Sequence, residues 1–212
     1  MQWNWDQEKT KQWLEPAMEA SYLAMRWSKQ EMLHFLDNGC GPGRHAMFFA
    51  RQGFHVTALD QSREALDYLK NWAEAEQVPV ELVCGDLFRM PFPDESFDCV
   101  MDYNVSYHTD TAGYRRAVEE LRRVLRPGGE VYMTLLSQND PGFRTAPAEA
   151  HIDRYTLVHE GGTPHFYGRQ EDFDAIFSGF SLALPVREIK TRGPGSTKES
   201  VHYHLLLKKE SK

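Results

Sequence analysis

Cysteines, long apolar runs and excess positive charge are scarce in this sequence. The three cysteines, Cys40, Cys84 and Cys99, form no C-x-x-C pair, so neither a disulfide framework nor a cysteine zinc site is expected. No apolar stretch approaches the roughly 20 residues that a membrane-spanning helix needs. The first 30 residues lack the apolar segment of a secretory signal. We therefore expect a cytoplasmic protein with no membrane partner.

The charge balance bears on the kind of partner. Acidic residues number 31 against 24 basic ones, which gives a formal net charge of −7. Proteins that hold phosphate backbones usually present a basic surface, so nucleic acid is disfavoured as a partner. The chain has 212 residues, of which 41% are hydrophobic, which is typical of one globular domain. The sequence leaves the oligomeric state open between a monomer and a homodimer.

Short apolar runs alternate with helical patterns along most of the chain. The runs are HFLD, HVTALD, VELVCG, FDCVMDY and EVYMTLL. Strands buried on both faces have this nearly continuous apolar character. After Ser62 and after Asp110, apolar residues instead recur at spacings of three and four, which is typical of helices that pack on a sheet. The alternation predicts an α/β fold with right-handed βαβ units and a doubly wound, mostly parallel sheet.

The last part of the chain has a different character. Two strand-like runs, PVREIKT and VHYHLLLKK, flank the turn-forming segment RGPGSTKES. They predict an antiparallel hairpin that closes a seven-stranded sheet. The segment 138–168 has no clear periodicity and is long for a connection, so we expect a substrate lid there. The whole chain is predicted as one domain with a helical cap at 1–30, a cofactor-binding core at 31–137, the lid at 138–168, and a helix with the closing hairpin at 169–212.

Alternating glycines follow the first predicted strand. Gly39, Gly41 and Gly43 come directly after Asp37, and a helix is expected to begin near Arg44. Glycine permits positive φ and lets a ligand approach the backbone without a Cβ in the way. Asp60 ends the next strand, where a carboxylate can accept hydrogen bonds from both hydroxyls of a ribose. A cofactor that contains ribose is therefore expected at this edge of the sheet.

The glycine loop fits two cofactors. Counted from Gly41 to Ala46 it satisfies the dinucleotide pattern G-x-G-x-x-G/A, which is typical of nicotinamide-dependent oxidoreductases. Counted from Asp37 it reads D-x-G-x-G-x-G, the form seen where S-adenosylmethionine binds. The chain has no recognisable Tyr-x-x-x-Lys or other hydride-transfer pattern, which favours the second interpretation.

Motifs beyond the loop complete a family pattern. Asp86-Leu87 follow the third strand, Ser96-Phe97-Asp98 begin the fourth, and RVLRPGG at 123–129 precedes the fifth. With the loop and Asp60, they resemble the class I S-adenosylmethionine-dependent methyltransferases, particularly the small methyltransferase-domain enzymes of bacteria. The resemblance runs from about residue 36 to residue 137. It implies S-adenosyl-L-methionine as the cofactor and S-adenosyl-L-homocysteine as the product.

The resemblance also implies roles for individual residues. The residues expected to bind the cofactor are Asp37, Gly39, Cys40, Gly41, Gly43, Asp60, Gln61, Asp86, Leu87 and Tyr103. Tyr103 and Asn104 stand where the family's fourth motif meets cofactor and substrate. Asn38 occupies a position where the family usually has an apolar residue, which puts the local packing in question.

Candidate substrate contacts lie after the fourth strand and in the expected lid. His108 is a candidate general base, because an unperturbed histidine pKa of about 6.5 suits proton transfer near neutral pH. The alternative is a turn histidine that satisfies backbone groups, and Asp110 or Thr111 is expected to cap the following helix. His165 and Tyr167 are candidates for substrate contact. His202 and His204 share one face of a strand but have no matching carboxylate or cysteine cluster in the sequence, so no metal site is predicted.

These features predict a methyltransferase that acts on a small molecule by in-line methyl transfer. A general base is needed only where the acceptor must lose a proton. A non-catalytic module that binds S-adenosylmethionine stays open as an alternative. The N-terminal tryptophans Trp3, Trp5, Trp13 and Trp27 can either pack two helices on the sheet or bring aromatic faces towards a sulfonium.

Overall fold

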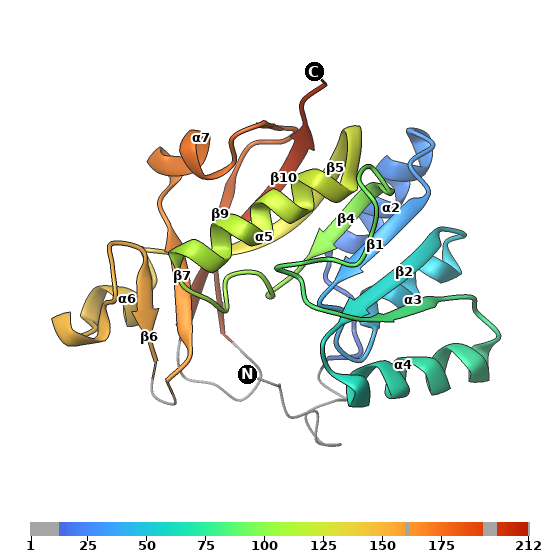
Figure 1. Ribbon diagram of the computed structural model, residues 1–212, viewed down its shortest axis with the longest axis horizontal. Coiled ribbons are helices and arrows are strands. Elements are labelled where there is room, and N and C mark those ends of the chain that lie inside the picture. Colours follow the sequence, from blue (N-terminus) through green and yellow to red (C-terminus); the bar gives the residue numbers. More distant parts are fainter. Residues whose placement is uncertain (1–12, 160–161, 193–198, 212) are drawn as a thin grey trace.

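An open sheet with helices on both faces forms the body of the molecule (Figure 1). The computed structural model describes residues 13–159, 162–192 and 199–211. Within them the strands are β1 (His34–Asn38), β2 (His55–Asp60), β3 (Glu81–Cys84), β4 (Phe97–Asp102), β5 (Leu125–Ser137), β6 (Thr156–Val158), β7 (Pro164–Gly168), β8 (Phe180–Leu182), β9 (Arg187–Arg192) and β10 (Glu199–Lys209). The main path through the sheet has the order β3-β2-β1-β4-β5-β10-β8.

The helices follow the strands in the alternation that the apolar pattern predicts. They are α2 (Glu19–Lys29), α3 (Arg44–Arg51), α4 (Arg63–Glu76), α5 (Thr111–Val124), α6 (Pro141–Thr145) and α7 (Phe173–Ile176), with 3-10 turns at η1 (Ala148–Ala150) and η2 (Gln170–Asp172). Polar side chains cap the two longest of them, α4 and α5. Ser62 accepts a hydrogen bond from the Ala65 amide at α4, and Asp110 accepts one from the Gly113 amide at α5. The predicted Asp110 cap is confirmed.

The parallel core of the sheet is confirmed. β1 lies between β2 and β4 and is parallel to both, with Leu36 aligned with Thr57 on one side and with Val100 on the other. Both faces of these strands are covered by helices, and this double burial explains their nearly continuous apolar runs. The C-terminal hairpin is also confirmed, because β9 pairs antiparallel with β10.

The sheet extends beyond the seven predicted strands. Among the described residues it has ten strands, and β7 joins the end of β5 in parallel while β6 pairs with β7. These strands of three and five residues lie in the segment that the sequence showed without periodicity. β5 also begins earlier than expected. Pro127-Gly128-Gly129 form a register shift inside β5 rather than a turn before it.

Each face of the sheet carries its own apolar core. α2, α3 and α4 pack on one face, where the ring centroids of Phe35 and Phe49 are stacked 4.0 Å apart. α5 and α7 cover the other face, where Tyr114 stacks on Phe166 at 4.2 Å. α5 crosses the front of the sheet in Figure 1. The cores therefore fix both surfaces of the sheet and leave the strand ends for the site.

The N-terminal cap is held by a buried ion pair. Glu130 on β5 is fully buried and receives two hydrogen bonds from the Arg26 guanidinium, at 2.8 and 2.6 Å. The indole Nε1 of Trp27 donates to the same carboxylate at 2.9 Å. Trp27 therefore packs on the sheet. For this residue, the structure agrees with the interpretation that the N-terminal tryptophans pack helices on the sheet. Trp3 and Trp5 lie outside the described residues.

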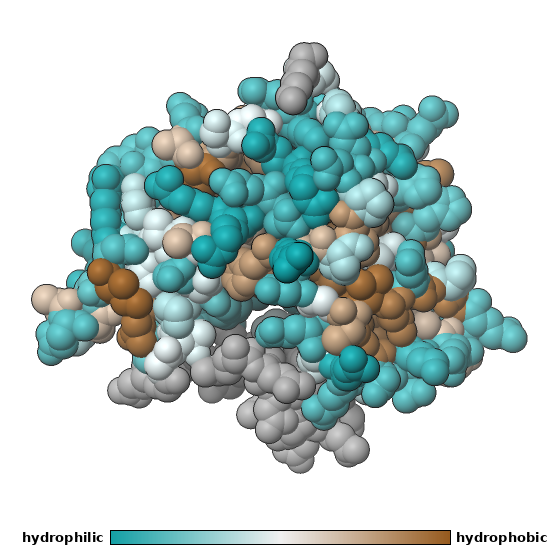
Figure 2. All heavy atoms as spheres, viewed as in Figure 1, coloured by the Kyte–Doolittle hydropathy of each residue, from teal (hydrophilic) through white to brown (hydrophobic). Residues whose placement is uncertain are grey.

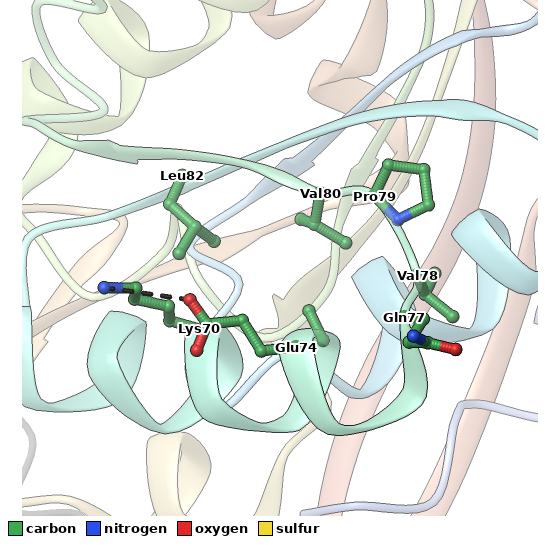
Figure 3. Close-up of a pocket in the computed structure, with 8 residues that line it drawn as sticks. Lys70, Glu74, Gln77, Val78, Pro79, Val80 and Leu82 are labelled. Carbon is green, nitrogen blue, oxygen red and sulfur yellow. Dashed lines mark ion pairs between the residues drawn. The ribbon is translucent and has the colours of Figure 1, made fainter.

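A shallow hollow lies along the outer edge of the sheet, between α4 and β3. Figure 2 shows apolar side chains gathered at this edge, on an otherwise largely hydrophilic face. The hollow is lined by the aliphatic side chains of Val78, Val80 and Leu82 and by the exposed pair of Lys70 and Glu74, 3.8 Å apart (Figure 3). None of the residues predicted to act in the site lines this hollow.

Glu130→Gln is expected to lower the free energy of unfolding by about 3 kcal/mol, because it leaves the Arg26 charge without its buried counter-charge. Glu76→Gln is the matched control. Glu76 also binds an arginine through two hydrogen bonds, at 2.8 and 2.6 Å, and accepts from an indole, that of Trp72, but it lies at the surface. Exposed pairs contribute little, so its effect should be much smaller. Urea unfolding of both variants measures the difference, and equal losses would contradict the role of burial.

Candidate active site

The ends of four parallel strands lead into one cavity of about 410 Å³. Because β1, β2, β3 and β4 are parallel, the loops that follow them meet at the same edge of the sheet. The lining residues are Trp13, Gly39, Cys40, Gly41, Pro42, Arg44, His45, Leu59, Asp60, Gln61, Gly85, Asp86, Leu87, Phe88, Tyr103, Asn104, Val105, Tyr107, His108, Thr163 and His165.

The glycine loop forms one wall of the cavity. Gly39 has a φ of +65°, and an added Cβ there would lie 2.3 Å from a methyl carbon of Val105. The Gly41 amide donates to a carboxylate oxygen of Asp60 at 2.8 Å, and the Ser62 amide donates to the other oxygen at 2.8 Å. Burial raises the pKa of Asp60, while these backbone donors lower it. Asp60 therefore ties the loop after β1 to the end of β2 and faces the cavity beside it.

The end of β3 supplies the adjoining wall. Asp86 accepts a hydrogen bond from the Phe88 amide at 2.9 Å, which closes a tight turn. Leu87 and Gln61 line the same part of the cavity. The structure thus brings together Gly39, Cys40, Gly41, Asp60, Gln61, Asp86, Leu87 and Tyr103 of the predicted cofactor residues.

Two predicted cofactor residues lie behind the wall rather than in it. Asp37 is buried and accepts a hydrogen bond from the Ala46 amide at 2.9 Å, so its carboxylate holds the start of α3. Gly43 precedes α3 with a φ of +95°, and a Cβ there would meet Leu69 at 2.2 Å. Both residues shape the loop from beneath and do not line the cavity. Their predicted direct contact with the cofactor is therefore not supported by their positions.

Asn38 belongs to a buried polar group under the same loop. Its side-chain amide donates to Asp102 at 2.6 Å, and the Ser106 hydroxyl donates to the same carboxylate. Burial raises the pKa of Asp102. Within the described part of the chain, Asn38 Oδ1 has no hydrogen-bond partner. The residue that departs from the family pattern therefore binds a buried carboxylate at the end of β4.

Arg44 is a site residue that the sequence analysis missed. Its guanidinium lies between the rings of Trp13 and Tyr103, at 5.0 and 5.1 Å from the two centroids. It also donates to the backbone oxygen of Glu15 at 3.3 Å. The sequence feature that could have identified Arg44 is its position as the first helical residue after the glycine loop. Among the described residues, Trp13 is thus an N-terminal ring that reaches the cavity.

Tyr103 and Asn104 lie where the chain leaves β4. Asn104 has a φ of +59°, and Thr134 on β5 holds it, accepting from its amide at 2.8 Å and donating to its side-chain oxygen at 2.9 Å. Asparagine is among the residues that tolerate this backbone conformation. The turn places both side chains at the cavity wall, as predicted.

His108 and His165 come together at the far wall. Nδ1 of His108 lies 2.8 Å from Nε2 of His165, although 57 residues separate them in the chain. The other nitrogens contact backbone oxygens, His108 Nε2 that of Asn104 at 3.2 Å and His165 Nδ1 that of Thr163 at 3.1 Å. The His108 ring opens into the cavity and contacts backbone groups as well. Both sequence interpretations of His108 therefore describe part of its position.

Tyr167 does not reach the cavity. It is buried, its hydroxyl lies 2.7 Å from Nε2 of His159, and its ring packs on Phe143 at 4.7 Å. Its predicted contact with substrate is therefore not supported.

The two histidines of β10 contact tyrosines. His202 Nε2 lies 3.2 Å from the Tyr107 hydroxyl, and His204 Nδ1 lies 2.6 Å from that of Tyr132. In residues 13–159, 162–192 and 199–211, no group of three or more histidine, cysteine, aspartate or glutamate side chains is placed to hold a metal ion. No helix of the described residues is long and apolar enough to cross a membrane.

Known methyltransferases are similar in sequence to this chain. Residues 35–129 match the methyltransferase domain family. A sterol 24-C-methyltransferase of Gibberella zeae is 35% identical over 132 residues, which are 58% of this chain and 34% of that protein. A malonyl-[acyl-carrier protein] O-methyltransferase of Yersinia pestis is 35% identical over 148 residues, 67% of this chain and 53% of that protein. The matched regions are therefore about a third to a half of these relatives.

A solved structure has the same fold. A SAM-dependent methyltransferase of Methanosarcina mazei superposes with a TM-score of 0.70 at 18% identity, over 84% of this chain and 92% of that chain. Residues 35–129 thus carry a methyltransferase domain, and the strand order, the glycine loop and the acidic strand ends are similar to those of the class I S-adenosylmethionine-dependent methyltransferases. S-adenosyl-L-methionine is the cofactor of this family.

The cavity fits that cofactor. A Cβ at Gly39 would press on Val105, so glycine is required for the loop to lie this close to the turn after β4. Asp60 presents a carboxylate that can accept hydrogen bonds from a ribose, and Asp86 and Leu87 line the adjoining wall. Arg44 offers a cation for the carboxylate of the methionine part.

Asp60→Asn is expected to weaken binding of S-adenosylhomocysteine by roughly 10- to 100-fold, which corresponds to the roughly 1.5–3 kcal/mol of a hydrogen bond to a charged group. Calorimetric titration measures the affinity. The unfolding temperature, measured alongside, separates loss of the ribose contact from loosening of the loop, since Asp60 also holds Gly41. An unchanged affinity would contradict the ribose assignment.

Asp37 is expected to make stability fall as the pH rises. Burial raises its pKa from the ordinary 3.8 to about 7 in the folded protein. The folded state then binds the proton more tightly than the unfolded one, so this stabilisation is present below about pH 4 and is lost by about pH 7. Asp37→Asn should remove that loss, measured as the free energy of unfolding at several pH values. Asp67→Asn, at an exposed site on α4, is the control, and matching curves for wild type and Asp37→Asn would contradict the assignment.

Proposed function

We propose that this chain transfers a methyl group from S-adenosyl-L-methionine to a small-molecule acceptor by in-line displacement. The observation that carries the proposal is that one cavity joins the cofactor loop, at Gly39 to Gly41, to a polar wall formed by Asn104, His108 and His165. Cofactor and acceptor can therefore lie against one another in a shared space. The bound cofactor supplies a methyl group on a positively charged sulfur that leaves with the bonding electron pair.

The chain's main contribution is to hold the two reactants in line. Asn104 and Tyr103 are fixed by Thr134 and by the Arg44 contact, on a turn that follows a buried strand. Placing reacting atoms at near-attack distance can contribute several kcal/mol to lowering a barrier. The rings of Trp13 and Tyr103 present aromatic faces that favour a neighbouring cation. Tyr103 and Asn104 are thus proposed as positioning residues.

A small acceptor is supported by the size and setting of the cavity. Its volume of about 410 Å³ lies in the usual range for small-molecule sites. The net charge of −7 disfavours a nucleic acid. The relatives are named for different acceptors, a sterol in one case and malonyl-[acyl-carrier protein] in the other, so they do not select one for this chain. We propose that segment 138–168, which contributes Thr163 and His165 to the wall, serves as part of the substrate pocket.

Two titrations and one assay test the proposal. We expect S-adenosylhomocysteine to bind in a calorimeter and NADH not to bind. Incubation of the protein with S-adenosylmethionine and an extract of small metabolites should then produce S-adenosylhomocysteine above the rate of the cofactor alone. Binding of NADH alone would revive the oxidoreductase interpretation of Gly41 to Ala46. Binding of S-adenosylhomocysteine without turnover on any extract would favour the non-catalytic module.

A further inference from the structure

The imidazoles of His108 and His165 form a pair with an unusual hydrogen-bonding requirement. Each ring is anchored from outside by a backbone oxygen, that of Asn104 for His108 and that of Thr163 for His165. The inner nitrogens, His108 Nδ1 and His165 Nε2, lie 2.8 Å from one another. A carbonyl oxygen only accepts, so both outer nitrogens must carry hydrogens.

Counting protons shows what this arrangement lacks. Two neutral imidazoles carry two hydrogens, and the backbone oxygens of Asn104 and Thr163 require both of them. The inner nitrogens are then left with two lone pairs that face one another. One added proton between them completes a third hydrogen bond and gives the pair a single positive charge. The pair is therefore built to take up one proton.

The surroundings keep that proton off in the resting protein. Loss of solvent around the rings is the largest cause that lowers the pKa of both histidines, to about 4 for His108. A charge on His165, and to a smaller extent on His202 and His159, lowers the pKa of His108 further. The backbone oxygens of Asn104 and Thr163 raise the pKa of His108 and of His165, respectively. Tyr107 packs on His108 at 4.6 Å, and His159 packs on His165 at 4.6 Å. These surroundings favour the neutral form of the pair, although the His108 ring is exposed at the cavity.

We propose that His108 and His165 together accept the proton released in methyl transfer, and that the methyl acceptor is a hydroxyl compound of the phenol or enol class. This inference rests on the proposed function and specifies its acceptor. The oxygen of the acceptor bonds to the methyl carbon while the carbon–sulfur bond breaks and its electron pair stays on sulfur. The hydroxyl proton passes to the space between His108 Nδ1 and His165 Nε2.

The charge balance of the cavity supports this step. Before transfer the sulfonium carries one positive charge and the histidine pair carries none. After transfer the sulfur is neutral and the pair carries one positive charge, so the net charge inside the cavity does not change. A step that conserves charge avoids the cost of creating a second positive charge beside the sulfonium.

The same balance favours a neutral acceptor that carries an acidic proton. A thioether or a tertiary amine has no proton to give up, so the pair would contribute nothing to its methylation. A protonated amine would add a further positive charge next to Arg44 and the sulfonium, which like-charge repulsion disfavours. Phenols and enols enter as neutral molecules, and their hydroxyl protons become strongly acidic as the new bond forms.

Nitrogen NMR of the protein labelled with ¹⁵N-histidine tests the pair without any turnover. With S-adenosylhomocysteine bound, we expect the outer nitrogens of both rings to stay protonated throughout an acid titration. The inner two should respond together to the uptake of a single proton, and His165→Gln should abolish that shared response in His108. An unprotonated outer nitrogen near neutral pH, or two rings that each bind a proton independently, would overturn the proposal.

Turnover of matched acceptors tests the assignment of the substrate class. Simple phenols and an enolic diketone are compared with dimethyl sulfide and pyridine, which have no proton to lose. We expect methylation of the hydroxyl compounds alone, and at least a roughly 100-fold lower kcat in His108→Gln and His165→Gln, with KM for the cofactor nearly unchanged. His55→Gln, which removes an exposed ring from a contact with His34 at 5.2 Å outside the cavity, is the matched control.

The outcomes separate the two proposals. Methylation of dimethyl sulfide or pyridine at a rate that the histidine variants leave unchanged would overturn the assignment of the pair while the methyltransferase function stands. Failure to bind S-adenosylhomocysteine would refute the proposed function itself. The NMR titration of the free protein would then still decide whether the two rings share a proton.

Discussion

Parallel pairing of β1 on both of its edges is the constraint on which the site depends. With β2 on one side and β4 on the other, the carboxyl ends of three strands lie in a row, and β3 adds a fourth. The loops after these strands line the cavity, together with Trp13 from the N-terminal segment and Thr163 and His165 at β7. The hydrogen bond from the Gly41 amide to Asp60 then fixes the glycine loop against the neighbouring strand end. A change in the strand register would therefore displace these wall residues together, because each lies in a loop that directly follows a strand.

The buried carboxylate that contacts α2 and those under the glycine loop are stabilised in different ways. Glu130 meets the arginine and the indole of α2, so its charge links the N-terminal helix to β5. Asp37 and Asp102 lie under the glycine loop without a comparable ion pair, and burial raises the pKa of each. Backbone and side-chain donors from Ala46, Asn38 and Ser106 satisfy them instead. Glu130 thus holds the cap in place, whereas the other two carboxylates set the shape of the loop.

The parts of the fold that were predictable from the sequence are those with a local signal. Apolar runs located the parallel strands, and the glycines with Asp60 located the cofactor side, because each pattern spans only a few residues. Strands β6 and β7 gave no such signal, since they are short and are held by the pairing of β7 with β5 and of β6 with β7. Tyr167 was misplaced for the same reason. It lies where β7 pairs with β5, whereas His165, two residues earlier, pairs only with β6 and remains at the cavity. The contact between His108 and His165 follows from that tertiary arrangement, which no local spacing encodes.

The distribution of charge along the cavity gives it a direction. Carboxylates lie at the ends of β2 and β3, where Asp60 and Asp86 face the space. The cation of Arg44 and the two histidines that can share a proton lie towards β4 and β7. A cofactor with hydroxyls on its ribose and a carboxylate at its other end would meet complementary groups with the ribose at Asp60 and the carboxylate at Arg44. Under the proposed function, the methyl acceptor would then lie on the side of Asn104 and the histidine pair. The placement of fixed charges would thus set the direction in which both molecules bind.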